Sequence, residues 1–376
     1  MLTATVMAVL LVGPASLPPV HAAQAVDSVT LQGRGYGHGH GLSQYGAEGA
    51  ARQGLGWKKI VRFYYPKTSF AQQSGKVRVL VTADTSDDVV VRARSGLVGR
   101  EVGKDARSWT LDRPDVNRWR IAPGAKNRLQ FKADGVWKTK ISSAKDLEFA
   151  AQGAPMRLVL PEGSASYRGV LRAVNGDSVN ILGLEAYLRG VVPEEVPALW
   201  HPNAVRAQAV AARTYAAFLM QADEHPHYDL CDTAYCQVYG GADAEHEASD
   251  AAIAATKGVV VVKGGAPIFS QFSASNGGWS SAGSRSYLVA QPDPYDAWDG
   301  NPHTKWKVSL DASAIEGTWP SIGRLTGVKV TVRDGNGTWG GRAVTVKING
   351  SKDSVSVSGE RFRSALGLRS TWLRVV

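Results

Sequence analysis

The stretch LEAYLRGVVPEEVPALWHPNAVRAQAVAARTYA, from Leu184 to Ala216, contains the clearest helical signal in the chain. Pro202 suits the first turn of a helix, because the N–H that proline lacks would be unpaired there. The many alanines favour helix and let it pack closely on several sides. The sequence therefore predicts a long helix over 201–222 at the centre of the fold.

Two consecutive glutamates, Glu194 and Glu195, stand between prolines just before this helix. Val196 precedes a proline and is pushed to an extended conformation, in which neighbouring side chains point to opposite faces. Only one glutamate would then face a given cleft. An apolar wall of Val196, Leu199 and Trp200 would raise the pKa of Glu195, as a general acid requires. The alternative is a solvated pair at a helix entrance, where the helix dipole favours carboxylates.

Strand-like runs lie on both sides of the helical middle. Between 77 and 174 they are short, rich in β-branched residues and separated by Ser, Asp, Gly and Pro: VRVLV, VVVRAR, NRLQF, WKTKI, MRLVL and VLRAV. GVVVVKGGAPIFSQFSAS (258–275) predicts a strand pair around a Gly-Gly turn, and further strands follow residue 306. Ser358 should cap a short helix that Gly367 closes. We expect an α+β fold, with a helix-rich core packed against mostly antiparallel β regions.

The segment GRGYGHGHGLSQYGAEGA (Gly33–Ala50) alternates glycine with larger residues. If Gly33–Gly41 runs extended, Arg34, Tyr36, His38 and His40 all fall on one face. Two histidines two residues apart could bind zinc, although no HExxH pattern or nearby carboxylate accompanies them.

Several of these motifs together resemble the SpoIID/LytB family, the group of sporulation stage II protein D and amidase enhancer. The resemblance rests on YLRGVVPEEVP, NAVRAQAVAARTYA, CQVYGG, SASNGG and SGERFRSALGLRST, and on the glycine–histidine segment with FYYPKTSF downstream. It covers most of the chain from residue 33 onward. In typical members the glycine–histidine motif follows the LGLRST-like segment, whereas here it stands near the N-terminus. We therefore expect a circularly permuted order, in which 33–70 packs beside 372–376.

The resemblance implies a catalytic acid at Glu195, in a lytic transglycosylase that cleaves the MurNAc–GlcNAc bond of peptidoglycan. The resulting function is cleavage of glycan strands, with peptides removed beforehand, to 1,6-anhydroMurNAc ends, without a required cofactor. A hydrolase would need a second carboxylate, for which Asp229, Asp232 and Glu194 are candidates. Two other functions stay open: a non-catalytic glycan-binding activator of a cell-wall amidase, and a zinc amidase that uses His38 and His40.

Polar residues of the matching motifs are candidates for substrate binding. The glycine–histidine segment, the long helix and the SASNGG turn contribute His38, His40, Gln44, Tyr45, Gln208, Arg213, Tyr215, Ser275, Asn276 and Gly277. Arg213 could instead tie the helix to the β layers, and the SASNGG turn could be a plain tight turn. Many family members have His where this chain has Ser273.

Both cysteines lie in HPHYDLCDTAYC (225–236). Two cysteines in an oxidising compartment usually pair, so we expect a disulfide between Cys231 and Cys236. Zinc held by His227 and the two cysteines is the alternative, since some family members bind zinc in this region.

The N-terminus and the composition indicate where the protein acts. Residues 1–25 resemble a secretory signal peptide, although no Lys or Arg precedes the apolar run, and no later segment is apolar enough to span a membrane. The formal charge of +10 suits anionic envelope polymers rather than nucleic acid, or serves solubility alone. We therefore expect a secreted, cell-wall protein that binds peptidoglycan glycan strands. Its predicted parts are a signal peptide (1–25), a glycine–histidine segment (26–70), a β-rich domain (71–175) and a SpoIID-like catalytic core (176–376).

Overall fold

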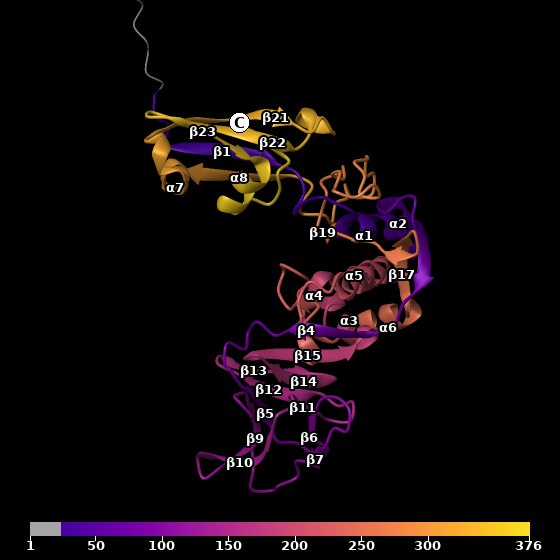
Figure 1. The fold of residues 1–376 in the computed structure, drawn as a ribbon. Coiled ribbons are helices and arrows are strands. Elements are labelled where there is room, and N and C mark those ends of the chain that lie inside the picture. The colour runs from indigo at the N-terminus through magenta and orange to yellow at the C-terminus, as the bar shows by residue number, and fades with distance from the viewer. Residues whose placement is uncertain (1–23) are drawn as a thin grey trace, which may run out of the picture.

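The computed structural model describes residues 24–376 and has three parts stacked along one axis (Figure 1). A strand-rich part lies at one end, a helical part in the middle, and a second strand-rich part, with the C-terminus, at the other end. The predicted α+β class is confirmed, with sheets that are mainly antiparallel. The proposed signal peptide lies almost wholly outside the described residues and stays a prediction, as do the exact domain boundaries.

The first strand-rich part consists of two sheets packed face to face. One sheet has the order β10-β9-β8-β5-β12-β13 and the other β16-β4-β15-β14-β11-β6-β7. Their strands are β4 (Lys76–Leu80), β5 (Val89–Arg92), β6 (Val98–Glu101), β7 (Ser108–Thr110), β8 (Arg118–Ala122), β9 (Asn127–Ala133), β10 (Val136–Ser143), β11 (Leu147–Ala150), β12 (Met156–Leu160), β13 (Gly163–Tyr167), β14 (Val170–Val174), β15 (Asp177–Gly183) and β16 (Leu230–Cys231). Each of the six predicted runs is a strand. Alternate residues from both sheets, such as Val79, Trp119 and Phe149, form the shared core.

The helical middle is organised around α5 (Pro202–Ala222), as the sequence predicts. The imidazole Nδ1 of His201 accepts the Asn203 N–H and caps its first turn. Its small side chains let two cores approach it from opposite sides: Ala209 and Ala212 join the first, Ala207 and Ala211 the second. Around it lie α1 (Gln44–Arg52), α2 (Trp57–Tyr64), α3 (Leu184–Arg189), α4 (Val192–Glu195), η1 (Gly241–Ala244) and α6 (Glu247–Ala255), with β2 (Leu42–Ser43), β3 (Ser69–Gln72), β17 (Val259–Lys263), β18 (Ala266–Pro267) and β19 (Phe272–Ser273).

The remaining part holds both ends of the described chain (Figure 1). It has two three-stranded sheets, β20-β1-β24 and β21-β22-β23. Its elements are β1 (Ser28–Gly33), β20 (Trp306–Asp311), α7 (Ala312–Thr318), η2 (Pro320–Ile322), β21 (Leu325–Arg333), η3 (Thr338–Gly340), β22 (Ala343–Gly350), β23 (Ser354–Ser358), α8 (Gly359–Ala365) and β24 (Leu373–Val375). The Ser358 hydroxyl caps α8 by accepting the Arg361 N–H, and Gly367 follows with φ of 62°, as expected.

The head of the chain pairs directly with its tail. β1 lies between β20 and β24, and the N–H of Val376 donates to the carbonyl of Thr30 at 3.0 Å. Further along, the N–H of Arg34 donates to the Trp372 carbonyl at 2.9 Å. The expected packing of 33–70 beside 372–376 is therefore present. The circular permutation relative to the family stays a prediction.

Candidate functional site

The glycine–histidine segment does not run extended. Gly35, Gly37, Gly39 and Gly41 all have positive φ, between 64° and 102°, so the chain turns at every second residue. A Cβ at Gly41 would lie 2.1 Å from the carbonyl oxygen of Gln271, which shows why glycine is needed there. The expected single face of four large side chains is wrong, because strict alternation of left-handed glycines folds the segment into turns.

The four large side chains of this segment point to different neighbours. Arg34 donates to the Gly277 carbonyl at 3.0 Å, and the Tyr36 ring meets that of His303 edge-on. His38 and His40 remain together, with stacked rings 4.9 Å apart. The turning backbone thus anchors the segment at one end and brings an imidazole pair toward the middle of the molecule.

The glycine–histidine segment (33–50) is called the head segment below. A hollow of about 540 Å³ lies where it meets the helical core. It is lined by Tyr36, Gly37, His38, Gln44, Glu195, Tyr215, Ala234, Tyr235, Cys236, Val238, Phe269, Gln271, Phe272, Ser273 and Ala274. Glu195 is the one carboxyl-bearing residue among these lining residues. Three parts of the sequence, far apart along the chain, therefore converge on a single acid.

Glu195 reaches this hollow from α4, a short helical turn. The extended conformation expected for the two glutamates is wrong, because Glu194 and Glu195 both lie in α4 and only Val196 is extended. The two still diverge, since Glu194 is exposed whereas Glu195 is half-buried. Glu195 is therefore the glutamate that faces the hollow, as the sequence predicts, although for a different geometric reason.

The surroundings of Glu195 favour its protonated form. Burial raises its pKa to about 7, and the charge of Glu194 acts in the same direction. Hydrogen bonds from the Gln44 amide, at 3.3 Å, and from the backbone of Val238 oppose this by stabilising the carboxylate. The group therefore titrates near neutral pH, where one carboxyl can both donate and accept a proton.

The apolar wall around Glu195 differs from the predicted one. Leu199 is 83% exposed, and Val196 points into the first hydrophobic core. The wall is made instead by Tyr215, Phe269 and Phe272, which line the hollow from α5 and the strand region after it. Side chains adjacent in sequence do not form the wall here, because α4 ends at Glu195 and the extended chain after it turns Val196 into the core and leaves Leu199 in solvent.

His38 is a neutral polar group in the wall. Burial lowers its pKa to about 3, and the charges of His40, Arg342 and Arg363 add to this shift. Its Nδ1 accepts the backbone N–H of His40 at 2.9 Å, so that ring nitrogen carries no proton. His38 can therefore contribute hydrogen bonds, but no positive charge, near neutral pH.

Of the other predicted binding residues, two also reach the hollow. Gln44 lies against Glu195, and Tyr215 lines the opposite wall with a pKa raised mainly by burial. His40 lies behind His38, with Nδ1 3.1 Å from the Ser281 carbonyl oxygen, and Tyr45 packs against Trp200. Neither His40 nor Tyr45 is among the lining residues.

Four of the predicted substrate contacts have buried side chains and do not line the hollow, so their binding role stays a prediction. Arg213 is fully buried and both of its hydrogen bonds to the Glu185 carboxylate measure 2.8 Å, so it ties α5 to α3. Gln208 is only 1% exposed within α5. Ser275 and Asn276 are fully buried in hydrogen bonds to carboxylates.

Backbone groups of the SASNGG turn (273–278) are also hydrogen bonded within the protein. The N–H of Gly277 donates to Asp296 at 2.9 Å, and its carbonyl accepts from Arg34. The turn is thus a structural support for the head segment. The Gly277 N–H is already paired in this structure, and a role of Gly277 in substrate binding stays a prediction.

Sequence reasoning missed the carboxylates behind this turn. Asp296 accepts hydrogen bonds from Ser43, Ser275, the Gly277 N–H and Asn301, and is fully buried. Its neighbour Asp293 accepts from Tyr64 and Asn276. Burial raises the pKa of Asp293 to about 6, with the Asp296 charge adding to the shift. The only available signal was the spacing of two aspartates in the Pro- and aromatic-rich PDPYDAWDG (292–300).

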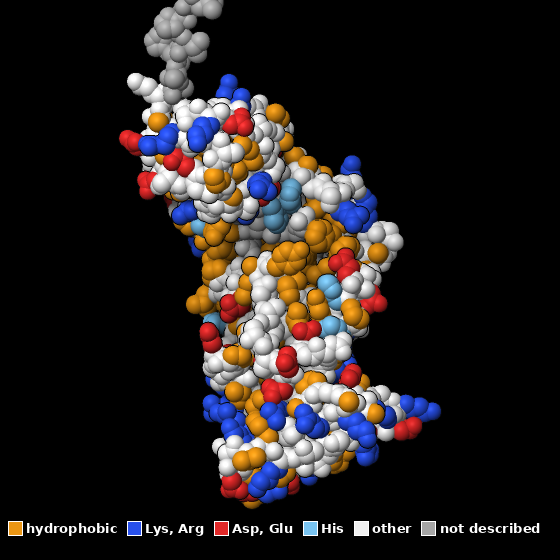
Figure 2. All heavy atoms as spheres, turned by 60° about the vertical axis from the view of Figure 1, so that its left-hand side comes forward, with side chains coloured by type: hydrophobic (Ala, Val, Ile, Leu, Met, Phe, Trp, Pro, Cys, Tyr) orange, Lys and Arg blue, Asp and Glu red, His pale blue; other side chains and the backbone are white. Residues whose placement is uncertain are grey.

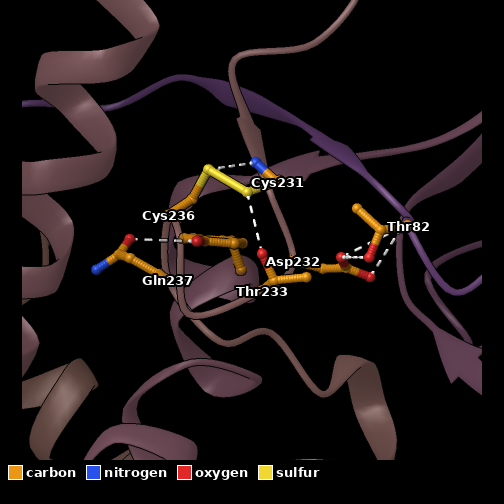
Figure 3. The surroundings of a disulfide bond; sticks show 7 residues. Thr82, Cys231, Asp232, Thr233, Cys236 and Gln237 are labelled. Atoms are coloured by element: carbon orange, nitrogen blue, oxygen red, sulfur yellow. Dashed lines mark hydrogen bonds between the residues drawn. A yellow bond between two sulfur atoms is a disulfide. The ribbon is translucent and has the colours of Figure 1, made fainter. Parts of the chain in front are cut away.

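A disulfide joins Cys231 and Cys236 and closes the loop beside the hollow (Figure 3). Asp232 accepts from the Thr82 hydroxyl at 2.6 Å on one side of this loop. Gln237 accepts from the Tyr187 hydroxyl on the other side. The alternative zinc set is not assembled, since both sulfurs are bonded to each other and His227 Nε2 lies 2.6 Å from Asp177.

Removing the disulfide should loosen this loop. We expect Cys231→Ser/Cys236→Ser to lower the free energy of unfolding by about 2 kcal/mol, because a five-residue separation makes a short closed loop. Urea unfolding measures the loss. Wild-type protein treated with reductant should match the variant, and thiol titration should find two free thiols only after reduction. Free thiols without reductant, together with bound zinc, would contradict the disulfide.

A second hollow of about 440 Å³ continues from the first. The two share four lining residues, Tyr215, Tyr235, Cys236 and Phe269. Figure 2 shows apolar side chains gathered over the middle part of the molecule on the side it draws, with histidines nearby. Together the two hollows form an elongated groove with aromatic walls, which suits a chain-like ligand better than a small molecule.

The three other candidate carboxylates are placed elsewhere. Asp229 is held by Arg78 at 2.6 Å and lines only the second hollow, while Asp232 is bonded to Thr82. Glu194 is exposed. None of the three lines the hollow of Glu195.

Across residues 24–376, no helix has the length and apolar character needed to cross a membrane. Within the same range, no three or more His, Cys, Asp or Glu side chains are grouped closely enough to hold a metal ion.

Comparison with known proteins finds a family match for the part of the chain that contributes Glu195 to the groove. Residues 174–262 match the family model "Stage II sporulation protein" (SpoIID). The chain is 35% identical to the amidase enhancer of Bacillus subtilis over 46% of this chain and 25% of that protein. It is 33% identical to stage II sporulation protein D of the same organism (54% of this chain, 62% of that protein). The same protein of Bacillus amyloliquefaciens is 32% identical over 51% of this chain and 60% of its own length.

The matches thus span between a quarter and about three fifths of the length of these curated relatives. The matched family region contains α3, α4 and α5, and with them Glu195 and Tyr215 of the groove. Residues 174–262 of this chain are thus similar to the SpoIID family, and the chain is similar to the SpoIID and amidase-enhancer proteins over part of their length.

Proposed function

We propose that this protein is a peptidoglycan lytic transglycosylase, with Glu195 as both acid and base. The observation that carries the proposal is a carboxyl with a pKa of about 7, the one carboxyl that lines the first hollow of an elongated, aromatic-walled groove. The named relatives support a role at the cell wall. The substrate would be the glycan strand, stripped of peptides, and the product would end in 1,6-anhydroMurNAc.

The proposed reaction needs one carboxyl and no cofactor. Protonated Glu195 donates its proton to the glycosidic oxygen as the bond from that oxygen to the MurNAc C1 breaks. The resulting carboxylate accepts the proton of the sugar's 6-hydroxyl, whose oxygen then bonds to C1 and closes the anhydro ring. The proton lost in the first step returns in the second, so Glu195 ends as it began. A hydrolase would need a second carboxylate near the first, and none lines this hollow.

The other lining residues fit the binding of a sugar chain. Tyr215, Phe269 and Phe272 offer aromatic surfaces for the apolar faces of pyranose rings. His38 and Gln44 supply hydrogen-bonding groups beside the acid without adding positive charge, which would lower the pKa of Glu195. We propose that the protein acts outside the cell, at the wall.

The second candidate function is activation of a wall amidase. It is favoured by the 35% identity to a protein named amidase enhancer. The same groove would then bind the glycan without cutting it. Incubation of the purified protein with peptide-free glycan strands, followed by mass spectrometry, separates the two: anhydro ends support cleavage. Their absence, with a faster amidase reaction on addition of the protein, would support the activator instead.

The pH dependence of cleavage should follow Glu195. Because its pKa is raised to about 7, the acid form that starts the reaction prevails below that pH and is lost above it. We expect a flat rate between about pH 5 and 6.5 and a fall approaching tenfold per pH unit above about 7. Initial rates of anhydro-end release at constant ionic strength measure this profile. A rate that rises through pH 7 would contradict an initiating acid.

The Gln44→Leu variant provides a control for this assignment. The amide of Gln44 stabilises the carboxylate form of Glu195, so its removal should raise the pKa of Glu195 further. We expect the alkaline limb of the pH–rate profile, where the rate falls, to move to a higher pH by up to about one unit. Because the position of the limb is independent of the absolute rate, this readout tolerates some loss of substrate binding. A limb that does not move, or moves downward, would contradict the assignment.

A further inference from the structure

Most of the net positive charge belongs to the strand-rich part that the proposed reaction does not use. Residues 76–183 contain 19 Lys and Arg against 12 Asp and Glu, which gives +7 of the chain's +10. Figure 2 shows many of these basic side chains over the lower part of the molecule. Charge of one sign collected on one domain attracts anionic polymers at long range.

One hollow in this domain concentrates that charge. It measures about 490 Å³ and lies on the outer face of the seven-stranded sheet. Its charged lining residues are Lys76, Arg100, Glu148 and Arg172. The strand register places Glu148 directly opposite Arg172 on one side and Arg100 on the other, so the three form a row across β14, β11 and β6.

The carboxylate in this row holds the two guanidinium groups in place. One oxygen of Glu148 accepts from Arg100 Nε, and the other accepts from Arg172 Nε and Nη2 at 2.9 and 2.7 Å. Glu148 is only 5% exposed, whereas the side chains of Arg100 and Arg172 are 41% and 25% exposed. The acid is thus fully engaged beneath two cations that face outward.

Donors remain free after this pairing. Within the described part of the chain, no partner is found for either Nη of Arg100 or for Nη1 of Arg172. Lys76 likewise forms no ion pair there and is exposed at the rim. Three cations against one carboxylate leave an excess of two positive charges around an open hollow. Guanidinium groups already fixed by Glu148 lose little freedom when they bind a further oxyanion.

We infer that this hollow is a binding site for the oxyanions of an anionic polymer, either phosphodiesters or carboxylates. Arg100 and Arg172 would contact the oxyanion with their free Nη groups, and Lys76 would contact it from the rim. The site is separate from the Glu195 groove and shares no lining residue with it. Its function would be to hold the protein on a polyanion, independently of whether Glu195 is catalytic.

Binding of defined polymers tests this inference. The probes are poly(glycerol phosphate), polygalacturonate and neutral dextran, titrated by calorimetry at fixed salt. We expect Lys76→Gln/Arg100→Gln to weaken binding about tenfold, because it removes two charge-assisted contacts. The matched control is Lys126→Gln/Lys140→Gln, which removes the same charge from exposed positions outside the hollow and should weaken binding less than twofold.

The binding of these variants decides whether the hollow is a specific oxyanion site. Selective loss in the first variant supports the site, and the polymer that binds more tightly identifies phosphodiester or carboxylate as its ligand. Equal loss of binding in both variants would overturn the site and show that diffuse surface charge binds the polymer. No binding of either polyanion would also overturn the site. Lys76→Gln alone serves as a second variant that cannot disturb Glu148 and should weaken binding about threefold. Glycan cleavage by all variants should match wild type, so failure here is distinguishable from failure of the proposed reaction.

Discussion

Glu195→Gln should abolish release of anhydro-ended fragments from glycan strands, with a loss of at least about 10³-fold. The substitution keeps the size of the side chain and its capacity to hydrogen bond, but an amide neither donates a proton to a leaving oxygen nor accepts one from a hydroxyl. Because the proposed mechanism uses the same group in both steps, one change removes both. Mass spectrometry of products from peptide-free strands measures the loss.

Glu194→Gln is the matched control for this experiment. It removes an equal charge from the adjacent residue, which is exposed and does not line the hollow. Since the Glu194 charge raises the pKa of Glu195, the control should keep its activity near neutral pH and shift the alkaline limb slightly downward. Equal losses in the two variants would point to a general effect on the α4 turn and not to the chemistry of one acid.

Strand binding by the Glu195→Gln variant separates catalysis from recognition. We expect its affinity for glycan strands to stay within about twofold of wild type, because the aromatic walls and His38 are untouched. Turnover equal to wild type would eliminate the catalytic role. Unchanged stimulation of an amidase by this variant, with no cleavage by either protein, would establish the activator function in its place.

The local parts of the fold followed from the sequence. The helix over 202–222 was marked by Pro202 and its alanines, and α8 by the Ser358 cap, because these signals act within a few residues. That Glu195 is the glutamate facing the hollow was also predictable, since the motif that contains it is contiguous. Head-to-tail packing was expected from the displaced position of the glycine–histidine segment.

The composition of the groove did not follow from the sequence, because it depends on contacts between distant segments. Gln44 and Glu195 are 151 residues apart, yet their side chains are hydrogen bonded. Arg213 has the polarity of a binding residue, and only its burial against Glu185 reveals a structural role. The positive φ of the alternate glycines likewise depends on packing against distant segments, as at Gly41, where a Cβ would lie 2.1 Å from the Gln271 carbonyl oxygen.

Asp296 explains how the head segment is held beside the groove. Its carboxylate accepts from the hydroxyls of Ser43 and Ser275 and from the N–H of Gly277, so one buried group joins the start of α1 to the SASNGG turn. Ser43 also caps α1, whose first residue is Gln44. The position of the Gln44 amide on Glu195 therefore depends on an aspartate that does not line the hollow.

Asp296→Ala should consequently be the most destabilising substitution in this region. It leaves several buried donors without an acceptor, and we expect a loss of at least about 3 kcal/mol in the free energy of unfolding. Asp299→Ala, at an exposed position three residues away, is the matched control and should change stability by less than about 0.5 kcal/mol. Urea unfolding of both variants measures the difference.

Hydrogen exchange shows whether the loss acts through the head segment. In Asp296→Ala, amides of 34–45 and 272–277 should exchange faster, while those of the strands between 76 and 174 keep their wild-type rates, because the two regions belong to separate hydrophobic cores. Asp296→Asn retains one acceptor oxygen and should show a smaller change of the same pattern. Cleavage should fall along with the protection of residue 44. Full protection and full activity in Asp296→Ala would mean that the head segment is held by its backbone contacts alone, and that this buried carboxylate does not position the groove.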